Sequence, residues 1–134
     1  SDNNRRSNQA TQAAQAALRY CEQLLTGEVT VPAGATALST AAAESNPSNE
    51  RWTSFSNWKL ATNAGGPVSV PSTVYTSSKA PQCMAQKRTL GTSEVIVVTA
   101  RGFSDNYAEN SDASGRTKAG SVVWLQSIIR LETL

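Results

Sequence analysis

The stretch RRSNQATQAAQAALRYCEQLL, residues 5–25, carries the strongest helical pattern in the chain. Its apolar residues recur at spacings of three and four, as on one face of an α-helix, and no Pro or Gly interrupts them. These residues are Ala10, Ala13, Ala14, Ala17, Leu18, Cys21, Leu24 and Leu25. Gly27 is well placed to end the helix, with Pro32 shortly beyond it. We therefore expect a long helix in residues 1–26, with Cys21 on its apolar side.

The opposite side of this predicted helix is polar. It carries Arg5, Asn8, Gln12, Gln15, Arg19 and Glu22. Alanine buries little surface per residue, so the apolar side suits close packing against a sheet or another helix. A long helix cannot bury both of its sides against one small sheet. We therefore expect one side to pack on the rest of the chain and the other to remain for contacts with neighbours.

The C-terminal half of the chain reads as β-structure. Residues 83–89 alternate in polarity, residues 90–93 (LGTS) form a turn, and residues 94–101 are rich in β-branched side chains. A polar, loop-like insert at 102–119 leads to a last strand at 121–131. Consecutive strands of this kind predict an antiparallel meander. The sequence thus predicts an α+β fold, with the N-terminal helix packed on a C-terminal antiparallel sheet of three to five strands.

The length of 134 residues fits one domain, so we expect residues 1–134 to fold as a single unit. Residues 27–82 form a variable connecting region between the helix and residues 83–134, which hold the sheet. Within the connecting region we expect a short strand at 28–31. A second strand in 68–75 is interrupted by a proline, so it should be short or lie at an edge.

Trp52, Phe55 and Trp58 are three residues apart, a spacing that suits one side of a short helix. Two interpretations stay open for these aromatic residues. They form a platform for stacking sugars or an interface patch, or they belong to the core. Aromatic residues at helical spacing lie more often in the core, which is the interpretation we favour.

Composition argues against several chemistries. The chain has no His, which excludes a Ser-His-Asp triad and imidazole metal ligands. Twelve Lys and Arg against ten Asp and Glu give a net charge of +2, too small to indicate a nucleic acid partner. Ser56-x-x-Lys59 and Ser104-Asp105-Asn106 match two short motifs of penicillin-recognising enzymes. Such matches are expected by chance in a Ser-rich chain. We expect a protein that is not an enzyme and has no cofactor.

Two clusters of charged residues are candidate binding sites. The acidic insert at 102–119 lacks the alternating acids and closing Glu of an EF-hand, so we expect a solvated loop and no metal site. Lys79, Lys87 and Arg88 form a small basic cluster without interleaved aromatic residues. A solvated edge is the simpler interpretation of that cluster.

The two cysteines, Cys21 and Cys83, leave two interpretations. They are unrelated buried thiols of a cytosolic protein, or they form one disulfide in an oxidising compartment. The chain is rich in Ser, Thr and Asn and poor in Lys, which favours export and the disulfide. Closing so long a loop would stabilise the fold by about 4 kcal/mol in the chain-entropy description.

Three pieces of the sequence stand in an order and spacing that resemble one family. Residues 8–22, NQATQAAQAALRYCE, are similar to an A-x-x-A-A-x-A-A-L-R helix with a trailing cysteine. Residues 80–83, APQC, lie where that cysteine's partner falls. Residues 97–102, VVTARG, and residues 122–127, VVWLQS, are similar to the family's closing pair of strands. Together they resemble the minor pilins of type IV pili, specifically the PilX-like pilus assembly proteins.

The resemblance implies a type IV pilin-like fold, seen here as the soluble part of a subunit whose N-terminal membrane helix is absent. That helix would anchor the subunit in the bacterial inner membrane, facing the periplasm, and later line the core of the extracellular pilus. The periplasm would supply the oxidising conditions for a Cys21–Cys83 disulfide that clamps helix to sheet. The implied function is a non-enzymatic subunit that primes or assembles the pilus near its tip. Residues 26–79 and 102–119 are the candidate surfaces for adhesion.

The implied partners are other minor pilins, the major pilin and the inner-membrane pilus assembly machinery. No nucleic acid is expected, and membrane contact is expected only through the absent N-terminal segment. Small side chains let helices approach closely. We therefore expect Ala10, Ala13, Ala14 and Ala17 to form the assembly interface.

Two alternatives remain. One is a pseudopilin of a type II secretion system, which calcium in residues 102–119 would favour. The other is a secreted ligand-binding or carbohydrate-binding domain that uses Trp52 and Trp58.

Overall fold

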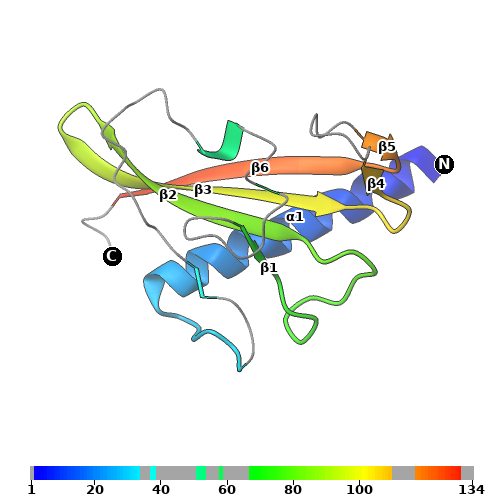
Figure 1. Cartoon of the computed structure of the whole chain (residues 1–134), viewed down its shortest axis with the longest axis horizontal. Helices are drawn as coiled ribbons and strands as arrows, with labels where there is room; N and C mark the ends of the chain where they lie inside the picture. Colours follow the sequence, from blue (N-terminus) through cyan, green and yellow to red (C-terminus); the bar gives the residue numbers. More distant parts are fainter. Residues whose placement is uncertain are drawn as a thin grey trace.

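The computed structural model describes residues 2–33, 37–38, 51–53, 58, 67–109 and 117–130. Its elements are α1 (Asp2–Thr26), the 3-10 helix η1 (Arg51–Thr53), β1 (Val68–Ser69), β2 (Gln82–Leu90), β3 (Ser93–Phe103), β4 (Ala108–Glu109), β5 (Thr117–Ala119) and β6 (Val122–Arg130). Four strands form an antiparallel sheet in the order β1-β2-β3-β6, and β4 and β5 form a separate hairpin. The α1 helix crosses behind the four-stranded sheet (Figure 1). The predicted α+β architecture is therefore confirmed.

The α1 helix spans almost the whole of the predicted range and ends where the sequence indicates. Gly27 takes a φ of 79°, a left-handed conformation that side chains disfavour. This bend lets the Glu28 amide donate a hydrogen bond of 2.9 Å to the carbonyl oxygen of Gln23. A bond from the second residue past the cap to a carbonyl in the last turn is the mark of a Schellman motif. No described helix has the length and apolarity to cross a membrane.

The core lies between α1 and the sheet face that it covers. Alternate residues of β3 face the helix and are fully or almost fully buried, namely Ile96, Val98 and Ala100. Cys83 and Ala85 of β2 complete this layer. Successive strand residues point to opposite faces, so the other residues of β3 form the second face of the sheet.

Gly102, near the end of β3, lies in close contact with the helix. A Cβ atom at this position would overlap the backbone of Ala10, Ala13 and Ala14. The missing side chain and the small alanine side chains therefore let the two elements lie against each other. This contact explains why the helix face contains alanine at these positions.

The strands at 83–89, 94–101 and 121–131 are confirmed, with bounds shifted by one or two residues at most ends. The strand in 68–75 is confirmed as the two-residue edge strand β1. The insert predicted at 102–119 begins later than expected, because Gly102 and Phe103 belong to β3 and the insert contains the β4–β5 hairpin. The short strand expected at 28–31 is wrong, since these residues form a bend and irregular chain after the helix cap. Phe55 lies outside the described residues, while Trp52 lies in η1.

Candidate functional site

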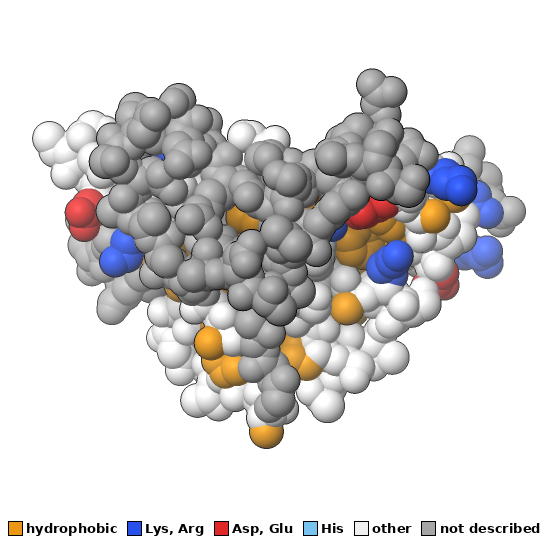
Figure 2. All heavy atoms as spheres, in the orientation of Figure 1, with side chains coloured by type: hydrophobic (Ala, Val, Ile, Leu, Met, Phe, Trp, Pro, Cys, Tyr) orange, Lys and Arg blue, Asp and Glu red, His pale blue; other side chains and the backbone are white. Residues whose placement is uncertain are grey.

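The sheet face away from α1 carries a cluster of polar and aromatic side chains centred on Arg101 of β3. Figure 2 shows hydrophobic side chains beside acidic and basic ones on this face, to the right of centre. The cluster includes residues from β2, β3, β6 and the β4 hairpin. It combines a buried ion pair with hydrogen bonds and several aromatic rings.

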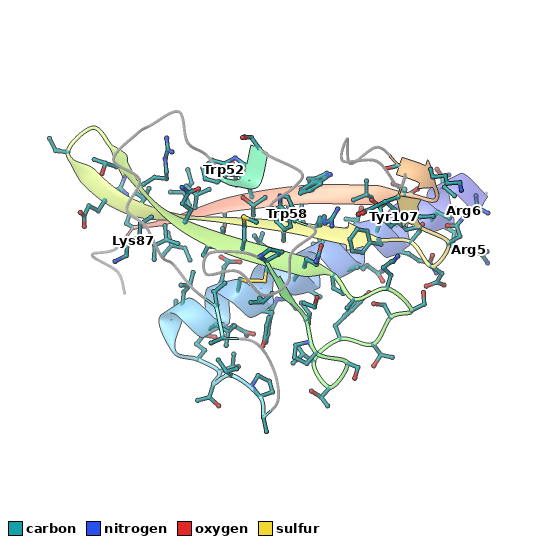
Figure 3. The ribbon with its side chains drawn as sticks, in the orientation of Figure 1. Arg5, Arg6, Trp52, Trp58, Lys87 and Tyr107 are labelled. Carbon is teal, nitrogen blue, oxygen red and sulfur yellow. A yellow bond between two sulfur atoms is a disulfide. The ribbon has the colours of Figure 1, made fainter. Side chains whose placement is uncertain are left out.

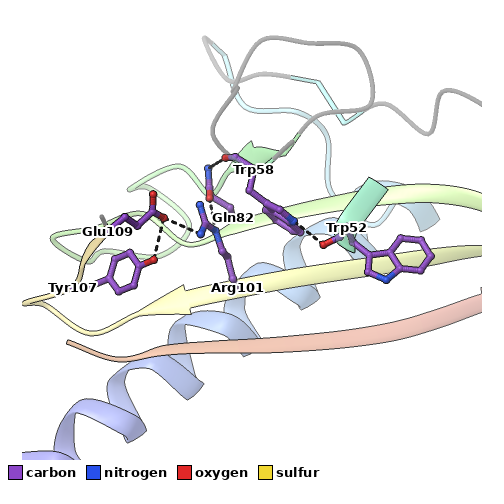
Figure 4. A network of polar contacts seen from close by, with 6 residues as sticks. All are labelled: Trp52, Trp58, Gln82, Arg101, Tyr107 and Glu109. Carbon is purple, nitrogen blue, oxygen red and sulfur yellow. Dashed lines mark hydrogen bonds and ion pairs between the residues drawn. The ribbon is translucent and has the colours of Figure 1, made fainter. Parts of the chain in front are cut away.

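Arg101 is held in place by two side chains. Its Nη1 atom lies 2.8 Å from Oε1 of Glu109, and its Nε donates a 2.7 Å hydrogen bond to Oε1 of Gln82 (Figure 4). The Arg101 side chain is 4% exposed, whereas that of Glu109 is 23% exposed. Removing a guanidinium from water is costly unless an anion and hydrogen bonds compensate it, and these two residues supply both.

Strand register explains which residues meet at Arg101. Gln82 of β2 lies directly opposite Arg101, and Trp124 of β6 lies opposite it on the other side. The three side chains thus form one row across the sheet, because residues directly opposite share a face. The guanidinium carbon is 5.3 Å from the centroid of the Trp124 ring.

Two more aromatic rings enclose the guanidinium. Its carbon lies 5.5 Å from the centroid of the Trp58 ring and 4.9 Å from that of Phe103. Trp58 and Trp124 meet edge to face, with ring centroids 5.0 Å apart. The Trp58 indole N–H donates a 3.1 Å hydrogen bond to the carbonyl of Trp52 (Figure 4). Negative ring faces attract the cation, so the cage adds to the stabilisation that Glu109 provides.

Tyr107 completes the cluster from the loop before β4. Its hydroxyl donates a 3.0 Å hydrogen bond to the same Oε1 of Glu109 that contacts Arg101. Burial, together with the hydrogen bond to the Glu109 carboxylate, raises the pKa of Tyr107 to about 12. Burial lowers the pKa of Arg101 from its ordinary value, although attraction to Glu109 opposes this shift. Tyr107 therefore stays protonated at neutral pH and acts as a donor.

A cavity of about 550 Å³ opens beside this cluster. Arg101, Glu109, Tyr107, Lys79 and Trp58 contribute to its walls. The Lys79 ammonium lies 5.7 Å from the centroid of the Tyr107 ring. The charges of Arg101 and Glu109 already compensate each other, and the Tyr107 hydroxyl is already engaged. The cluster thus links β2, β3 and β6 to the β4–β5 hairpin, and its role is to hold the hairpin in place on the sheet.

The predicted disulfide is confirmed. Cys21 of α1 and Cys83 of β2 are bonded, with their Cα atoms 6.3 Å apart across a sequence separation of 62 residues. Both cysteines are fully buried in the helix–sheet core, and the sulfur–sulfur bond is visible in Figure 3. The bond joins the helix covalently to the sheet.

The structure corrects the expected assembly interface. Ala10, Ala13, Ala14 and Ala17 are at most 1% exposed, because they are the residues that pack against the sheet. They form the internal helix–sheet contact and are not accessible to another chain. The exposed side of α1 is the polar one, and we call Asn8, Gln12, Gln15 and Arg19 its outer flank.

The interpretation of the tryptophans as core residues holds for Trp58, whose side chain is fully buried. The interpretation as a stacking platform is not supported there, because the ring meets Trp124 edge to face and offers no open surface. Trp52 is half-buried, and the Arg88 guanidinium lies 5.8 Å from its centroid.

The basic cluster of the sequence is dispersed in the structure. Lys79 lies over Tyr107, whereas Lys87 lies far along β2 from that tyrosine (Figure 3). Lys87 and Arg88 are neighbours in one strand, so their side chains point to opposite faces of the sheet. The three cations do not form a common surface.

The acidic insert is used for internal contacts. Asp105 accepts hydrogen bonds of 3.1 Å from Gln9 of α1 and 3.2 Å from Ser78. The hydroxyl of Ser104 donates to Asn106 and accepts from the backbone amide of Ser121, so this Ser-Asp-Asn match has a structural role. Residues 110–116, like Ser56 and Lys59, lie outside the described part of the chain. Within the described part, no group of three or more acidic or cysteine residues is arranged to hold a metal ion.

Sequence reasoning did not single out the Arg101 cluster. Arg101 entered only as part of the VVTARG motif, and Glu109 only as one acid of the insert. One signal was available, because Arg101 is the single charged residue in the buried part of β3, residues 95–103. Such a residue on a buried strand needs a partner.

No protein-family model, curated protein sequence or solved structure matches this chain.

Proposed function

We propose that this chain is a non-enzymatic structural subunit of a type IV pilus, a minor pilin of the PilX-like kind. The observation that carries the proposal is the division of α1 into two sides. One side packs on the sheet through alanines, and the other, the outer flank, faces away from it. A filament subunit needs such a helix, attached firmly to its own domain and free to meet its neighbours.

Two separate contacts attach α1 firmly to the sheet. Near the middle of the helix, Gly102 lets the β3 backbone lie against Ala14. About two turns further along the helix, the Cys21–Cys83 bond joins α1 and β2 covalently. A helix fixed in this way transmits force to the globular part without sliding. The disulfide also agrees with a protein that matures in an oxidising compartment such as the periplasm.

The chemistry of the outer flank suits contacts that are specific and reversible. Its side chains are two amides of Gln, one of Asn and one guanidinium. Amide groups both donate and accept hydrogen bonds, so each can pair with a like residue on a neighbouring helix. We propose other minor pilins and the major pilin as those neighbours. We further propose that the subunit acts at or near the pilus tip, where it primes assembly and contributes to adhesion.

Gene deletion and complementation in the source bacterium test the proposal. Deletion is expected to reduce the number of surface pili seen by electron microscopy, and the full-length gene to restore it. A variant carrying Gln12→Glu and Gln15→Glu keeps good helix formers but places like charges on the outer flank, so it should fail to restore piliation. Thr92→Glu, in the exposed β2–β3 turn, is the matched control and should restore it.

Folding of each variant is checked by circular dichroism of the purified domain and by the mass of its intact disulfide. Normal piliation after deletion, or full rescue by the flank variant, would contradict the proposal. Normal pili with a loss of protein secretion would instead assign the chain to a type II secretion pseudopilus. The alternative of a carbohydrate-binding domain is less well supported, because the Trp58 ring has no exposed face.

A further inference from the structure

The outer edge of β6 is the feature that carries a further inference. β6 is the last strand of the sheet, and β3 is its one neighbour among the described strands. In Figure 4 the strand forms the lower border of the sheet. An edge strand presents backbone N–H and C=O groups that can pair with another strand.

The direction of these groups follows from one hydrogen bond. The Ser104 amide donates to the Ser121 carbonyl at 3.0 Å, so this pair is of the hydrogen-bonded type. Such pairs alternate with non-hydrogen-bonded pairs along an antiparallel ladder. The next residue, Val122, therefore points its backbone groups away from β3. The same holds for every second residue that follows, namely Trp124, Gln126, Ile128 and Arg130.

Features that usually protect an edge are missing from β6. The strand is nine residues long, contains no proline and carries one charged residue, Arg130. Two of its large hydrophobic side chains are exposed, Trp124 at 43% and Ile128 at 56%. Natural proteins normally blunt exposed edges with short strands, prolines or several charges. A long apolar edge indicates a partner.

We propose that β6 pairs with β6 of a second copy of this chain, antiparallel and centred on Gln126. All nine residues are then matched, because Gln126 is the midpoint of Val122–Arg130. Trp124 lies opposite Ile128 of the partner subunit, and Val122 lies opposite Arg130 of the partner subunit. Every outward-pointing backbone group finds a partner, and the two sheets join into one of eight strands.

The sequence of β6 favours a second copy over an unrelated segment. The register is self-complementary, because the exposed aromatic residue meets the exposed β-branched one twice, on either side of the centre. It also separates like charges, since each Arg130 faces a valine. The two-fold axis lies perpendicular to the sheet, so both α1 helices lie on the same face. This pairing rests on β6 alone and does not depend on the proposed pilus function.

Sedimentation equilibrium of the purified domain over a concentration series tests the proposal. The contact is small compared with a standard interface, so we expect a weak dimer in the micromolar range or above. Ile128→Glu should weaken it at least tenfold by placing a charge opposite Trp124. Gln126→Pro should weaken it similarly, because the lost N–H points outward and the monomer's ladder does not use it. Val74→Glu is the matched control, since Val74 is another exposed hydrophobic residue, and should leave the dimer unchanged.

A cross-linking experiment keeps the proposal testable if a variant folds poorly. Gln126→Cys places the new thiols next to each other at the two-fold axis, so a short bis-maleimide should give a covalent dimer. Thr92→Cys, at the β2–β3 turn, should give none. A wild-type domain that stays monomeric at about 1 mM, a dimer that Ile128→Glu leaves intact, or equal cross-linking of both cysteine variants would overturn the proposal.

Discussion

Gly102 of β3 lies directly against the backbone of Ala14 in α1. A side chain on Gly102 would overlap the amide nitrogen of Ala14 and the carbonyl oxygen of Ala10. The obstacle is backbone, which cannot rotate away as a flexible side chain can. This contact sets how closely the helix and the sheet approach.

Gly102→Ala is therefore expected to destabilise the domain by about 1–3 kcal/mol, since the added methyl forces helix and sheet apart. Chemical denaturation followed by circular dichroism measures the change. Gly91→Ala is the control, because nothing lies within 4 Å of its added Cβ and only its positive φ opposes the substitution. The control should cost no more than about 1 kcal/mol. An equal effect of both variants would show that Gly102 is not a close-packing position.

Removal of the Cys21–Cys83 bond should lower the free energy of unfolding by about 2–5 kcal/mol. The bond closes a loop with a sequence separation of 62 residues, and both cysteines are fully buried. Urea unfolding with and without a reductant measures the difference. The double variant Cys21→Ala, Cys83→Ala serves as the control and should not respond to the reductant. Unfolding curves of the wild type that coincide under both conditions would show that the disulfide does not stabilise the domain.

Glu109→Gln should destabilise the domain by about 2–4 kcal/mol, because it leaves the Arg101 guanidinium buried without its anion. Arg101→Met, which keeps an apolar stem among the aromatic rings, should cost less. The double variant should cost clearly less than the sum of the single ones, since each residue is expensive mainly without its partner. Denaturation of the four proteins in a double-mutant cycle measures this coupling. Additive effects would mean that the pair does not act as a unit.

The stability of the domain should fall between pH 10 and 12. Tyr107 titrates near its ordinary pKa of 10.0 when unfolded and at about 12 in the folded protein, chiefly because burial disfavours the phenolate. Over that range the folded state binds more protons than the unfolded state, so the free energy of unfolding decreases as the pH rises. Burial raises the pKa of Tyr20 in the same direction. Urea midpoints measured across the range give the slope, and Tyr107→Phe should reduce it. A slope that this variant leaves unchanged would argue against Tyr107 as its source.

Tyr20→Phe and Tyr107→Phe should have opposite effects at neutral pH. The Tyr20 hydroxyl is buried in the helix–sheet core and has no hydrogen-bond partner among the described residues. Its removal relieves a desolvation cost and should stabilise the domain by about 1 kcal/mol. The Tyr107 hydroxyl donates to Glu109, so the same change there should destabilise by a similar amount. Thermal unfolding by calorimetry compares the pair, and a destabilised Tyr20→Phe variant would mean that the hydroxyl has a partner.

The helix and the three long strands were predictable because their signals are local. Spacing of three and four residues in α1 and β-branched runs in β3 report secondary structure within one element. The short strand expected at 28–31 failed for a local reason too. The amides of Glu28 and Val29 bond to the carbonyl of Gln23, so the helix cap takes up the groups that a strand would need.

The Arg101 cluster was not predictable in the same way. Its members include residues of β2, β3, β4, β6 and the loop before β4, and only the strand register places Gln82 and Trp124 on either side of Arg101. Periodicity indicates that a side chain lies on a given face of a strand. It does not indicate which residue of which strand lies opposite.

The sequence alone determined that the chain has an alanine-lined helix, an antiparallel sheet after it and a pair of cysteines placed to join them. Only the tertiary structure decided what those alanines contact. An apolar stripe requires cover, but its pattern is the same whether the cover is a neighbouring subunit or the chain's own sheet. The position of Gly102 resolves the choice, because a backbone that approaches this closely leaves no room for another chain.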